Sequence, residues 1–369
     1  MNIKYVILRF IKMDLLAPFV TSYGKVQKRE MILVEVEDTD GVTGWGEVVA
    51  FSIPWYTEET IQTCFHVLDE FLIPSLLKGE CKHPEDLTAV FSPVKRNRMA
   101  KAGLDTALWD LYATKREKPL ASVLGGTRNK IEAGVVIGID DIPKMLAKIE
   151  QYLKEGYKRF KVKIKPGYDY ELIRQIRKEY PSLPLMADAN SAYTLHDIER
   201  LKLLDEFELM MIEQPLDSDD IVDHAKLQRE IMTPICLDES IVSYDDVRKA
   251  IELGSCQIVN VKVGRVGGLT EAKRIHDLCL DQRIDLWVGG MLESGVSRAH
   301  NIALASLPGF TIPGDISASS RYWEKDVIVP EVIVTDGYIQ VPSKIGMGFE
   351  IDREFLKKVT YETKTYKAM

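Results

Sequence analysis

The sequence predicts an α/β protein: a barrel of alternating strands and helices, with an α+β capping domain formed by the N-terminal part and the C-terminal tail. The first observation is a series of charged residues, each at the end of an apolar run: Lys163, Asp188, Glu213, Asp238 and Lys262. The first three intervals are 25 residues long and the last is 24. This period fits one strand, one loop and one helix, and it places each charge at the C-terminal end of a strand.

The second observation is the alternation of strand and helix patterns after residue 130. Strand candidates lie at residues 133–139, 160–164, 185–188, 209–213, 235–238, 258–261, 285–289 and 310–315. Helical patterns separate most of these eight segments, for example over residues 170–179. The layout predicts a TIM-type (β/α) barrel, in the modified (β/α)7β form.

The third observation is a different pattern near the N-terminus. Strands are expected at residues 2–16, 31–37 and 42–47, and the last two form a hairpin. Over residues 98–113 the apolar side chains recur three and four positions apart, which predicts a helix with one buried face. Antiparallel strands followed by helices are typical of an α+β domain.

Three regions follow from these patterns. Residues 1–125 are expected to form the α+β capping domain with lid loops, residues 126–320 the catalytic barrel, and residues 321–369 a segment that returns to the capping domain. In this last segment a hairpin is expected over residues 332–341, turned at Asp336 and Gly337.

Two segments of the capping domain are expected to be apolar loops, at residues 17–24 and 51–56. They carry the apolar and aromatic side chains of Phe19, Tyr23, Ile53 and Trp55. Loops of this composition commonly close over a substrate and exclude water. We therefore expect both segments to act as lids.

Composition excludes several classes of protein. The chain has 369 residues, 46% of them hydrophobic and 28% charged, and a formal net charge of −8, which argues against a nucleic-acid partner. No apolar run approaches the ~20 residues of a membrane helix, and charges interrupt the first residues where a signal peptide would be apolar. The five cysteines are odd in number and lack a C-x-x-C pair, so free thiols and a cytoplasmic location are expected.

The segment 160–164 places its charges on one face. In a strand, Phe160, Val162 and Ile164 point to one side, whereas Lys161 and Lys163 point to the other. An edge strand with solvated lysines is one explanation, because edge strands commonly carry lysine. The periodic acids that follow favour the other explanation, a strand that delivers two ammonium groups into a site.

The three acids Asp188, Glu213 and Asp238 are candidate metal ligands. Carboxylates that converge from adjacent strands repel one another unless a cation neutralises them. Oxygen ligands favour a hard divalent cation, first Mg²⁺ and then Mn²⁺ as a substitute, over zinc. Alternatives exist for each acid taken singly, since Asp188 could cap the following turn and the other two could pair with lysines.

Lys163 and Lys262 are candidate bases. They lie on the second and sixth barrel strands, with the acids between them, so a substrate at the centre would present one face to each lysine. A lysine acts as a base when its pKa is lowered, which nearby Mg²⁺, Lys161 and Arg265 would do. The reaction that fits is removal of the proton α to the carboxylate of a small-molecule substrate, with stabilisation of the enediolate. A non-catalytic barrel that keeps its metal site for binding is the rival interpretation.

Several motifs resemble a known family. They are Lys161-Val162-Lys163, Asp188-Ala189-Asn190, Glu213-Gln214-Pro215, Asp238-Glu239-Ser240, Lys262-Val263-Gly264-Arg265 and, in the first domain, Gly44-Trp45-Gly46-Glu47. Over nearly the whole chain they resemble the muconate-lactonizing subgroup of the enolase superfamily. The resemblance implies catalytic roles for Lys163 and Lys262, a Mg²⁺ site at the three acids, and a homo-oligomer. It also implies a substrate-binding set: Lys161, Asn190, Arg265, Met291, Ser294, Tyr23 and Trp55.

Within that subgroup, two further segments resemble those of o-succinylbenzoate synthases, many of which are also similar to N-succinylamino acid racemases: Gly290-Met291-Leu292-Glu293-Ser294-Gly295 and Pro313-Gly314-Asp315-Ile316-Ser317-Ala318-Ser319. The synthase reaction dehydrates 2-succinyl-6-hydroxy-2,4-cyclohexadiene-1-carboxylate to 2-succinylbenzoate in menaquinone biosynthesis. Dipeptide epimerases usually carry Asp-x-Asp after the last strand, whereas here Ser317 follows Asp315 at that spacing. Mandelate-racemase-type members use a histidine from the seventh strand, and residues 287–290 contain none. Synthase and racemase share the proton abstraction and the same five residues, so both remain open.

Overall fold

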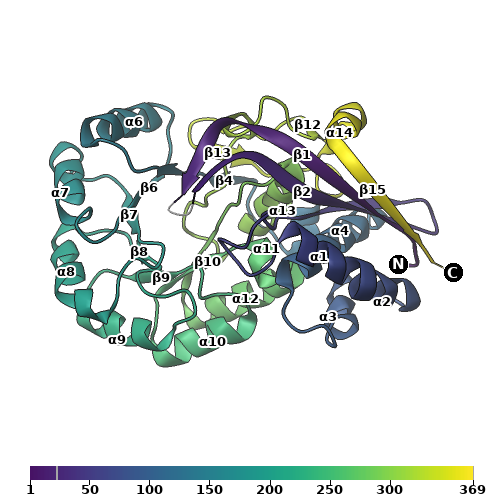
Figure 1. Ribbon diagram of the computed structural model, residues 1–369, viewed down its shortest axis with the longest axis horizontal. Helices are drawn as coiled ribbons and strands as arrows, with labels where there is room; N and C mark the ends of the chain where they lie inside the picture. The colour runs from purple at the N-terminus through teal and green to yellow at the C-terminus, as the bar shows by residue number, and fades with distance from the viewer. Residues whose placement is uncertain (22–23, 369) are drawn as a thin grey trace.

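A four-stranded antiparallel sheet forms the capping half of the molecule in the computed structural model, which describes residues 1–21 and 24–368 (Figure 1). Its strands, in spatial order, are β15 (Thr360–Lys367), β1 (Ile3–Thr21), β2 (Gly24–Asp38) and β3 (Thr43–Val48). The tail of the chain thus returns to pair with its beginning, Tyr5 lying opposite Lys367. The limits at residues 125 and 320 remain a proposal for the domain organisation.

Helices cover one face of this sheet: α1 (Ile61–Val67), α2 (Ile73–Lys78) and α4 (Arg98–Lys115) contact its strands. The short elements η1 (Leu68–Leu72), η2 (Pro84–Asp86) and α3 (Leu87–Val90) pack among these helices. Val6 and Leu8 from β1 share a buried core with Leu104 and Leu108 from α4. The helix predicted over residues 98–113 is confirmed, but the single buried face is wrong: α4 is buried on nearly all sides, and Asp105, Trp109 and Asp110 are buried as well.

Seven parallel strands form the barrel sheet in the described part of the chain. In order they are β5 (Gly134–Ile137), β6 (Arg159–Lys163), β7 (Leu185–Asp188), β8 (Ile212–Glu213), β9 (Ile235–Leu237), β10 (Ile258–Val261) and β11 (Asp285–Val288). Neighbours in the sheet are neighbours in the sequence, which is the arrangement of a β/α barrel. The predicted fold class is confirmed.

Helices alternate with these strands. They are α6 (Ile142–Lys154), α7 (Tyr170–Glu179), η3 (Leu195–Asp197), α8 (Ile198–Lys202), η4 (Leu203–Phe207), α9 (Val222–Glu230), α10 (Tyr244–Leu253), α11 (Val263–Val266), α12 (Leu269–Gln282) and α13 (Gly295–Ala305). Figure 1 shows α6 to α10 on the outer side of the sheet. The short α5 (Leu120–Leu124) leads from the capping helices into the barrel. Among the described residues no helix combines the length and the apolar character needed to cross a membrane.

The segment expected as the eighth strand, residues 310–315, closes the barrel without forming a regular strand. Ile312 and Asp315 donate their N–H groups to the carbonyls of β11 at 3.2 and 3.0 Å, and Gly134 of β5 donates to Gly314 O at 2.8 Å. Pro313 interrupts the segment, and proline has no N–H to extend a ladder. Closure brings Asp315 to the same end of the barrel as the other strand-end residues.

Two local predictions are corrected. Residues 17–21, expected as a loop, continue β1 and pair with β2 beyond an irregularity between Asp14 and Phe19. Pro18 falls at this irregularity, where a missing N–H costs the ladder nothing. The expected hairpin over residues 332–341 is also wrong: its turn forms, but the second arm β13 (Tyr338–Gln340) pairs with β4 (Lys130–Glu132).

The remaining elements of the tail are short. They are η5 (Ser319–Arg321), β12 (Ile328–Val329), β14 (Glu350–Ile351) and α14 (Arg353–Val359). The pair of β12 with β14 precedes α14, from which the chain enters β15.

Glycine allows β3 to lie directly on α4. A methyl group at Gly46 would lie 2.6 Å from Thr106 Oγ1 and 2.7 Å from the backbone nitrogen of Ala107. We expect Gly46→Ala to lower the free energy of unfolding by about 1–3 kcal/mol, because two backbones would have to separate. Denaturant unfolding measures this, with Gly138→Ala as control, since a methyl there meets nothing within 4 Å. Equal stability of the two variants would contradict the contact.

Candidate active site

The predicted strand-end charges meet at one edge of the barrel. In the register of the sheet, Lys163 lies opposite Asp188, and Asp188 lies opposite Glu213. Asp238 and Lys262 each follow directly after their strands, β9 and β10. Because the strands are parallel, all five side chains start from the C-terminal edge of the sheet, where barrel enzymes place their chemistry.

The strand that carries two lysines is an interior strand. β6 pairs with β5 on one side and with β7 on the other, so the edge-strand explanation is wrong. Lys161 is buried, with 5% of its side chain exposed, and Lys163 is 28% exposed. Both ammonium groups therefore point into the barrel, as the alternation in residues 160–164 predicted.

Each lysine contacts the acids. Lys163 Nζ lies 2.6 Å from Asp188 Oδ2 and donates to Asn190 Oδ1 at 2.5 Å. Lys161 Nζ lies 3.0 Å from Glu213 Oε2 and 3.3 Å from Asp188 Oδ2. One end of the carboxylate set is thus neutralised by two ammonium groups.

The other end of the set is neutralised by Lys262 and Arg265. Lys262 Nζ lies 2.9 Å from Asp238 Oδ2, and the Arg265 guanidinium lies 2.6 Å from Asp238 Oδ1. The hydroxyl of Tyr56, from the second predicted lid segment, accepts a hydrogen bond from Lys262 at 2.6 Å and from Arg265 at 2.7 Å. A side chain of the capping domain therefore contacts one of the two candidate bases.

The acids differ in their pKa values because their cations differ. Burial opposes ionisation of Asp188, but Lys163 and Lys161 outweigh it and hold the pKa of Asp188 below its ordinary value. Burial likewise opposes ionisation of Asp238, and Arg265 and Lys262 hold its pKa low. For Glu213, burial and the neighbouring Asp188 prevail over Lys161 and raise the pKa to about 8.

Lys262 does not have the lowered pKa that its role as a base led us to expect. Burial lowers the pKa of Lys262 and so does the Arg265 guanidinium, yet the carboxylate of Asp238 outweighs them and raises it above its ordinary value. Arg265 pairs with that same carboxylate. In this charge state Lys262 is a stable cation, suited to stabilising negative charge on a substrate.

The residues at this edge fit a hard divalent cation in their chemistry. The candidate ligands offer oxygen only, and two buried oxygens beside them, Asn260 Oδ1 and Glu239 Oε2, have no hydrogen-bond partner among the described residues. Within residues 1–21 and 24–368 no group of three or more His, Cys, Asp and Glu side chains is assembled as a metal cluster. The ammonium of Lys161 lies between two of the three carboxylates instead.

The other predicted site residues differ in their distance from this edge and in their contacts. Asn190 joins Lys163 to Glu239, since its amide nitrogen donates to Glu239 Oε1 at 3.0 Å. Trp55 lies beside Phe51, with 4.6 Å between the ring centroids, and Met291 is half-buried between the two main cores. Tyr23 lies outside the described residues.

Ser294 is used to join the two halves of the molecule. Its hydroxyl donates to Glu47 Oε2 at 2.6 Å and its N–H to Glu47 Oε1 at 3.1 Å, and it also caps the first turn of α13. The side chain is fully buried. Contact between Ser294 and a substrate remains a prediction.

Sequence reasoning missed four residues of this edge: Tyr56, Glu239, Asn260 and Asp315. Asn260 alternates with Lys262 along β10 and donates to Glu213 Oε1 at 2.9 Å, so the period-two pattern could have indicated it. Burial and Asp238 raise the pKa of Glu239 to about 7. Asp315 ends the expected eighth strand, so the repeat could have indicated it, whereas Tyr56 comes from the capping domain and nothing in the spacing of the barrel repeat points to it.

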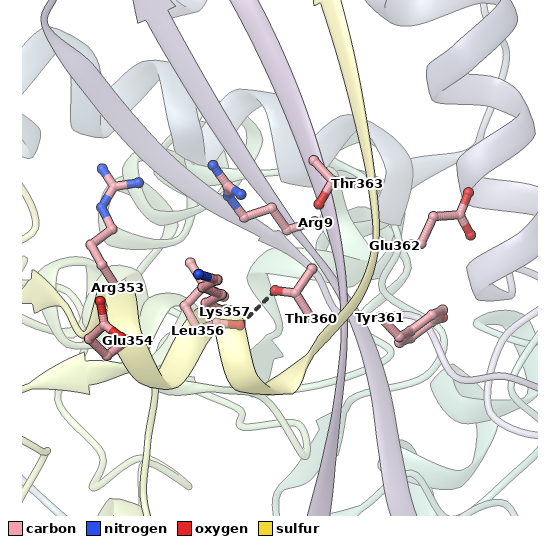
Figure 2. A pocket seen from close by; sticks show the side chains of 9 residues that line it. All are labelled: Arg9, Arg353, Glu354, Leu356, Lys357, Thr360, Tyr361, Glu362 and Thr363. Carbon is pink, nitrogen blue, oxygen red and sulfur yellow. Dashed lines mark hydrogen bonds between the residues drawn. The ribbon is translucent and has the colours of Figure 1, made fainter.

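A hollow of about 510 Å³ lies apart from this edge, between β1, α14 and β15 (Figure 2). It is lined by Arg9, Arg353, Glu354, Leu356, Lys357, Thr360, Tyr361, Glu362 and Thr363. Arg9 and Arg353 both pair with the buried carboxylate of Glu35, so they hold α14 against the capping sheet. None of the predicted site residues lines this hollow.

Comparisons with known proteins agree with the geometry. Residues 6–125 match the mandelate racemase / muconate lactonizing enzyme N-terminal domain, and residues 144–355 match the enolase C-terminal domain-like family. The chain is 57% identical to an o-succinylbenzoate synthase of Geobacillus kaustophilus, over 99% of this chain and 98% of that protein. It is 46% identical to an N-succinylamino acid racemase of Thermus thermophilus, over 98% of both chains.

A solved structure of an enolase-superfamily member from Listeria innocua superposes with a TM-score of 0.98 at 42% identity, covering 100% of both chains. The family models together span most of this chain, and the relatives match it nearly end to end. With parallel strands that deliver lysines and carboxylates to one edge beneath an antiparallel cap, the chain belongs to the enolase superfamily of enzymes.

Proposed function

We propose that this chain is an o-succinylbenzoate synthase, which removes water from 2-succinyl-6-hydroxy-2,4-cyclohexadiene-1-carboxylate to give 2-succinylbenzoate. The observation that carries the proposal is one lysine at each end of the carboxylate set: Lys163 2.6 Å from Asp188 and Lys262 2.9 Å from Asp238. Relatives named o-succinylbenzoate synthase at 55–57% identity support it. The two lysines of these motifs are therefore arranged as the proposed proton removal requires.

Lys163 is the proposed base. Its neutral amine takes the proton α to the substrate carboxylate, and the electron pair of that C–H bond moves into the enediolate. In a syn elimination the hydroxyl leaves from the same face, so the Lys163 ammonium can return the proton and release water. Lys262 stays a cation and stabilises the enediolate charge from the other face, as the raised pKa of Lys262 favours.

The proposed metal is Mg²⁺, with Mn²⁺ as a substitute, held by Asp188, Glu213 and Asp238. Members of this superfamily are generally metal-dependent. A divalent cation there would neutralise negative charge on the substrate carboxylate and so favour loss of the α-proton. The raised pKa of Glu213 fits this assignment, because a buried carboxylate with too little positive charge around it gains most from a cation.

The remaining predictions from the sequence are also part of this proposal. Substrate-binding roles are proposed for Lys161, Asn190, Arg265, Met291, Ser294, Tyr23 and Trp55. We further propose a homo-oligomer in the cytoplasm, the latter because the cysteines are free and buried.

N-succinylamino acid racemisation is the second candidate, alone or as an additional activity. It needs two opposing bases, and Lys163 and Lys262 occupy opposite ends of the acid set. A relative named N-succinylamino acid racemase matches at 46% identity. In racemisation Lys163 would act on one enantiomer and Lys262 on the other, so Lys262 must be neutral in half of the cycle.

Removal of the metal tests the cofactor. We expect a chelator to abolish synthase activity, because the ammonium and guanidinium groups of this edge are already paired with its carboxylates. Added Mg²⁺ or Mn²⁺ should restore it, as measured by the rate of 2-succinylbenzoate formation. Full activity in metal-stripped protein would contradict the assignment.

Replacement of Lys163 tests the base. We expect Lys163→Ala to lower kcat by about 10²–10⁴-fold on both synthase and racemase substrates, since each reaction begins with proton removal. Lys165→Ala is the matched control, because Lys165 lies two residues further along the chain and is exposed. Near-wild-type turnover by Lys163→Ala would rule out the assigned role.

Replacement of Arg265 separates the two activities. Arg265→Gln removes a cation that lowers the pKa of Lys262 and frees the Asp238 carboxylate that raises it, so Lys262 becomes harder to deprotonate. Racemase kcat/KM should fall further than synthase kcat/KM, by roughly tenfold for each unit of pKa. Both rates are measured on one preparation whose circular dichroism matches the wild type. Equal losses would mean that Arg265 only maintains the shape of the site.

A further inference from the structure

Asp315 lies among the charged groups of the active site, although it belongs to neither the proposed ligands nor the proposed bases. It comes from the segment that closes the barrel, where its N–H donates to Val288 O at 3.0 Å. Its two carboxylate oxygens contact different cations: Oδ1 contacts the guanidinium of Arg159, and Oδ2 lies 2.6 Å from Lys161 Nζ. Asp315 therefore adds a further carboxylate to this edge of the barrel.

Lys161 is shared between this carboxylate and two proposed metal ligands. Its Nζ lies 2.6 Å from Asp315, 3.0 Å from Glu213 and 3.3 Å from Asp188. Three carboxylates thus surround one ammonium group, and Glu213 accepts a hydrogen bond from it. Asp315 is the nearest of the three.

A divalent cation and the Lys161 ammonium would compete for the same oxygens. A metal held by Asp188 and Glu213 would draw on the two carboxylates that Lys161 now contacts, and the two positive charges would repel. A buried ammonium that loses its partners is costly, so Lys161 needs a carboxylate that the metal does not use. Asp315 is such a carboxylate.

Arg159 holds Asp315 in place for this task. The Arg159 side chain is fully buried, and it donates to Pro313 O at 2.8 Å and contacts Met186 Sδ at 3.1 Å. Gly134 leaves room for it, because a methyl at Gly134 would lie 2.8 Å from Arg159 Nε. A fixed guanidinium on Oδ1 keeps Oδ2 directed at Lys161.

We propose that Asp315 is a positioning residue that retains the Lys161 ammonium when a divalent cation takes the oxygens of Asp188 and Glu213, and that it thereby sets the affinity for the cation. This inference rests on the metal site of the proposed function. Lys161 is then the resident counter-ion of the metal-free site, and Asp315 is its partner in both states.

The test is a double-mutant cycle on Mg²⁺ affinity, measured by calorimetric titration of the metal-stripped full chain with MgCl₂. We expect Asp315→Asn to weaken Mg²⁺ binding by about tenfold or more, since Lys161 then stays on the ligands. In a Lys161→Met background, where no ammonium has to move, the same Asp315→Asn change should alter the affinity by less than about twofold. Lys161→Met alone should bind Mg²⁺ at least as tightly as the wild type.

An equal loss in both backgrounds would overturn the inference, because the carboxylate would then act on the metal through space and not through Lys161. An unchanged affinity in Asp315→Asn would overturn it as well. A wild-type chain that binds no Mg²⁺ would instead overturn the metal site of the proposed function, and this inference with it. The two failures are therefore distinguishable.

Glu35→Gln is the matched control. The Glu35 carboxylate also holds one guanidinium on each oxygen, those of Arg9 and Arg353, but it lies in the capping sheet (Figure 2 shows the two arginines). It should leave Mg²⁺ affinity unchanged. If Asp315→Asn does not fold, Asp315→Glu replaces it: this variant keeps the charge for Lys161 and should bind Mg²⁺ within about threefold of the wild type, whereas a tenfold loss would count against the inference.

Discussion

Repulsion between buried carboxylates is the constraint on which the rest of the structure depends. Asp188, Glu213 and Asp238 reach one edge of the barrel because parallel strands in register end together. Carboxylates this close together cannot all stay ionised without cations beside them. The protein supplies ammonium and guanidinium groups at both ends of the set. The pKa values of Asp188 and Asp238 are held low by the cations that contact them, whereas burial and the neighbouring Asp188 raise the pKa of Glu213.

The capping domain is tied to this edge by buried polar contacts. Arg29 from β2 donates to Leu292 O at 2.9 Å and to Ala50 O at 2.7 Å, and Glu47 from β3 accepts from Ser294 and Ser297 of the barrel. The segment after β3 leads directly to Tyr56. The Tyr56 hydroxyl can contact Lys262 because β3 is fixed to the barrel by the charge-assisted hydrogen bonds of Glu47.

The same charge balance relates the two candidate activities. In the proposed mechanisms, dehydration and the racemisation of one enantiomer both begin with proton transfer to Lys163, and they differ in what Lys262 must do afterwards. Asp238 favours the cationic form of Lys262, which serves dehydration, whereas Arg265 opposes that form. A few side chains around one ammonium group can therefore shift the balance between two reactions on one scaffold.

Much of the site could be predicted from sequence because the barrel is a local repeat. A strand, a loop and a helix together have a typical length. Spacing alone therefore predicted that five charged residues share one edge of the barrel: Lys163, Asp188, Glu213, Asp238 and Lys262. Alternation along residues 160–164 also predicted that both lysines share a face. The tail hairpin was less predictable, because the partner of Tyr338 is distant in sequence, whereas Pro313 was a local signal that the expected eighth strand would be irregular.

By itself, then, the sequence determined the barrel, its order of strands and the five residues on its edge, since all of these follow from short-range periodicity. Only the tertiary structure decided which cation meets which carboxylate. Tyr56 reaches Lys262 across 206 positions of sequence, and Asp315 reaches Arg159 across 156. No periodicity links residues so far apart; their contacts exist because barrel closure and the docked cap bring separate segments to one buried place, where each charge must find a partner.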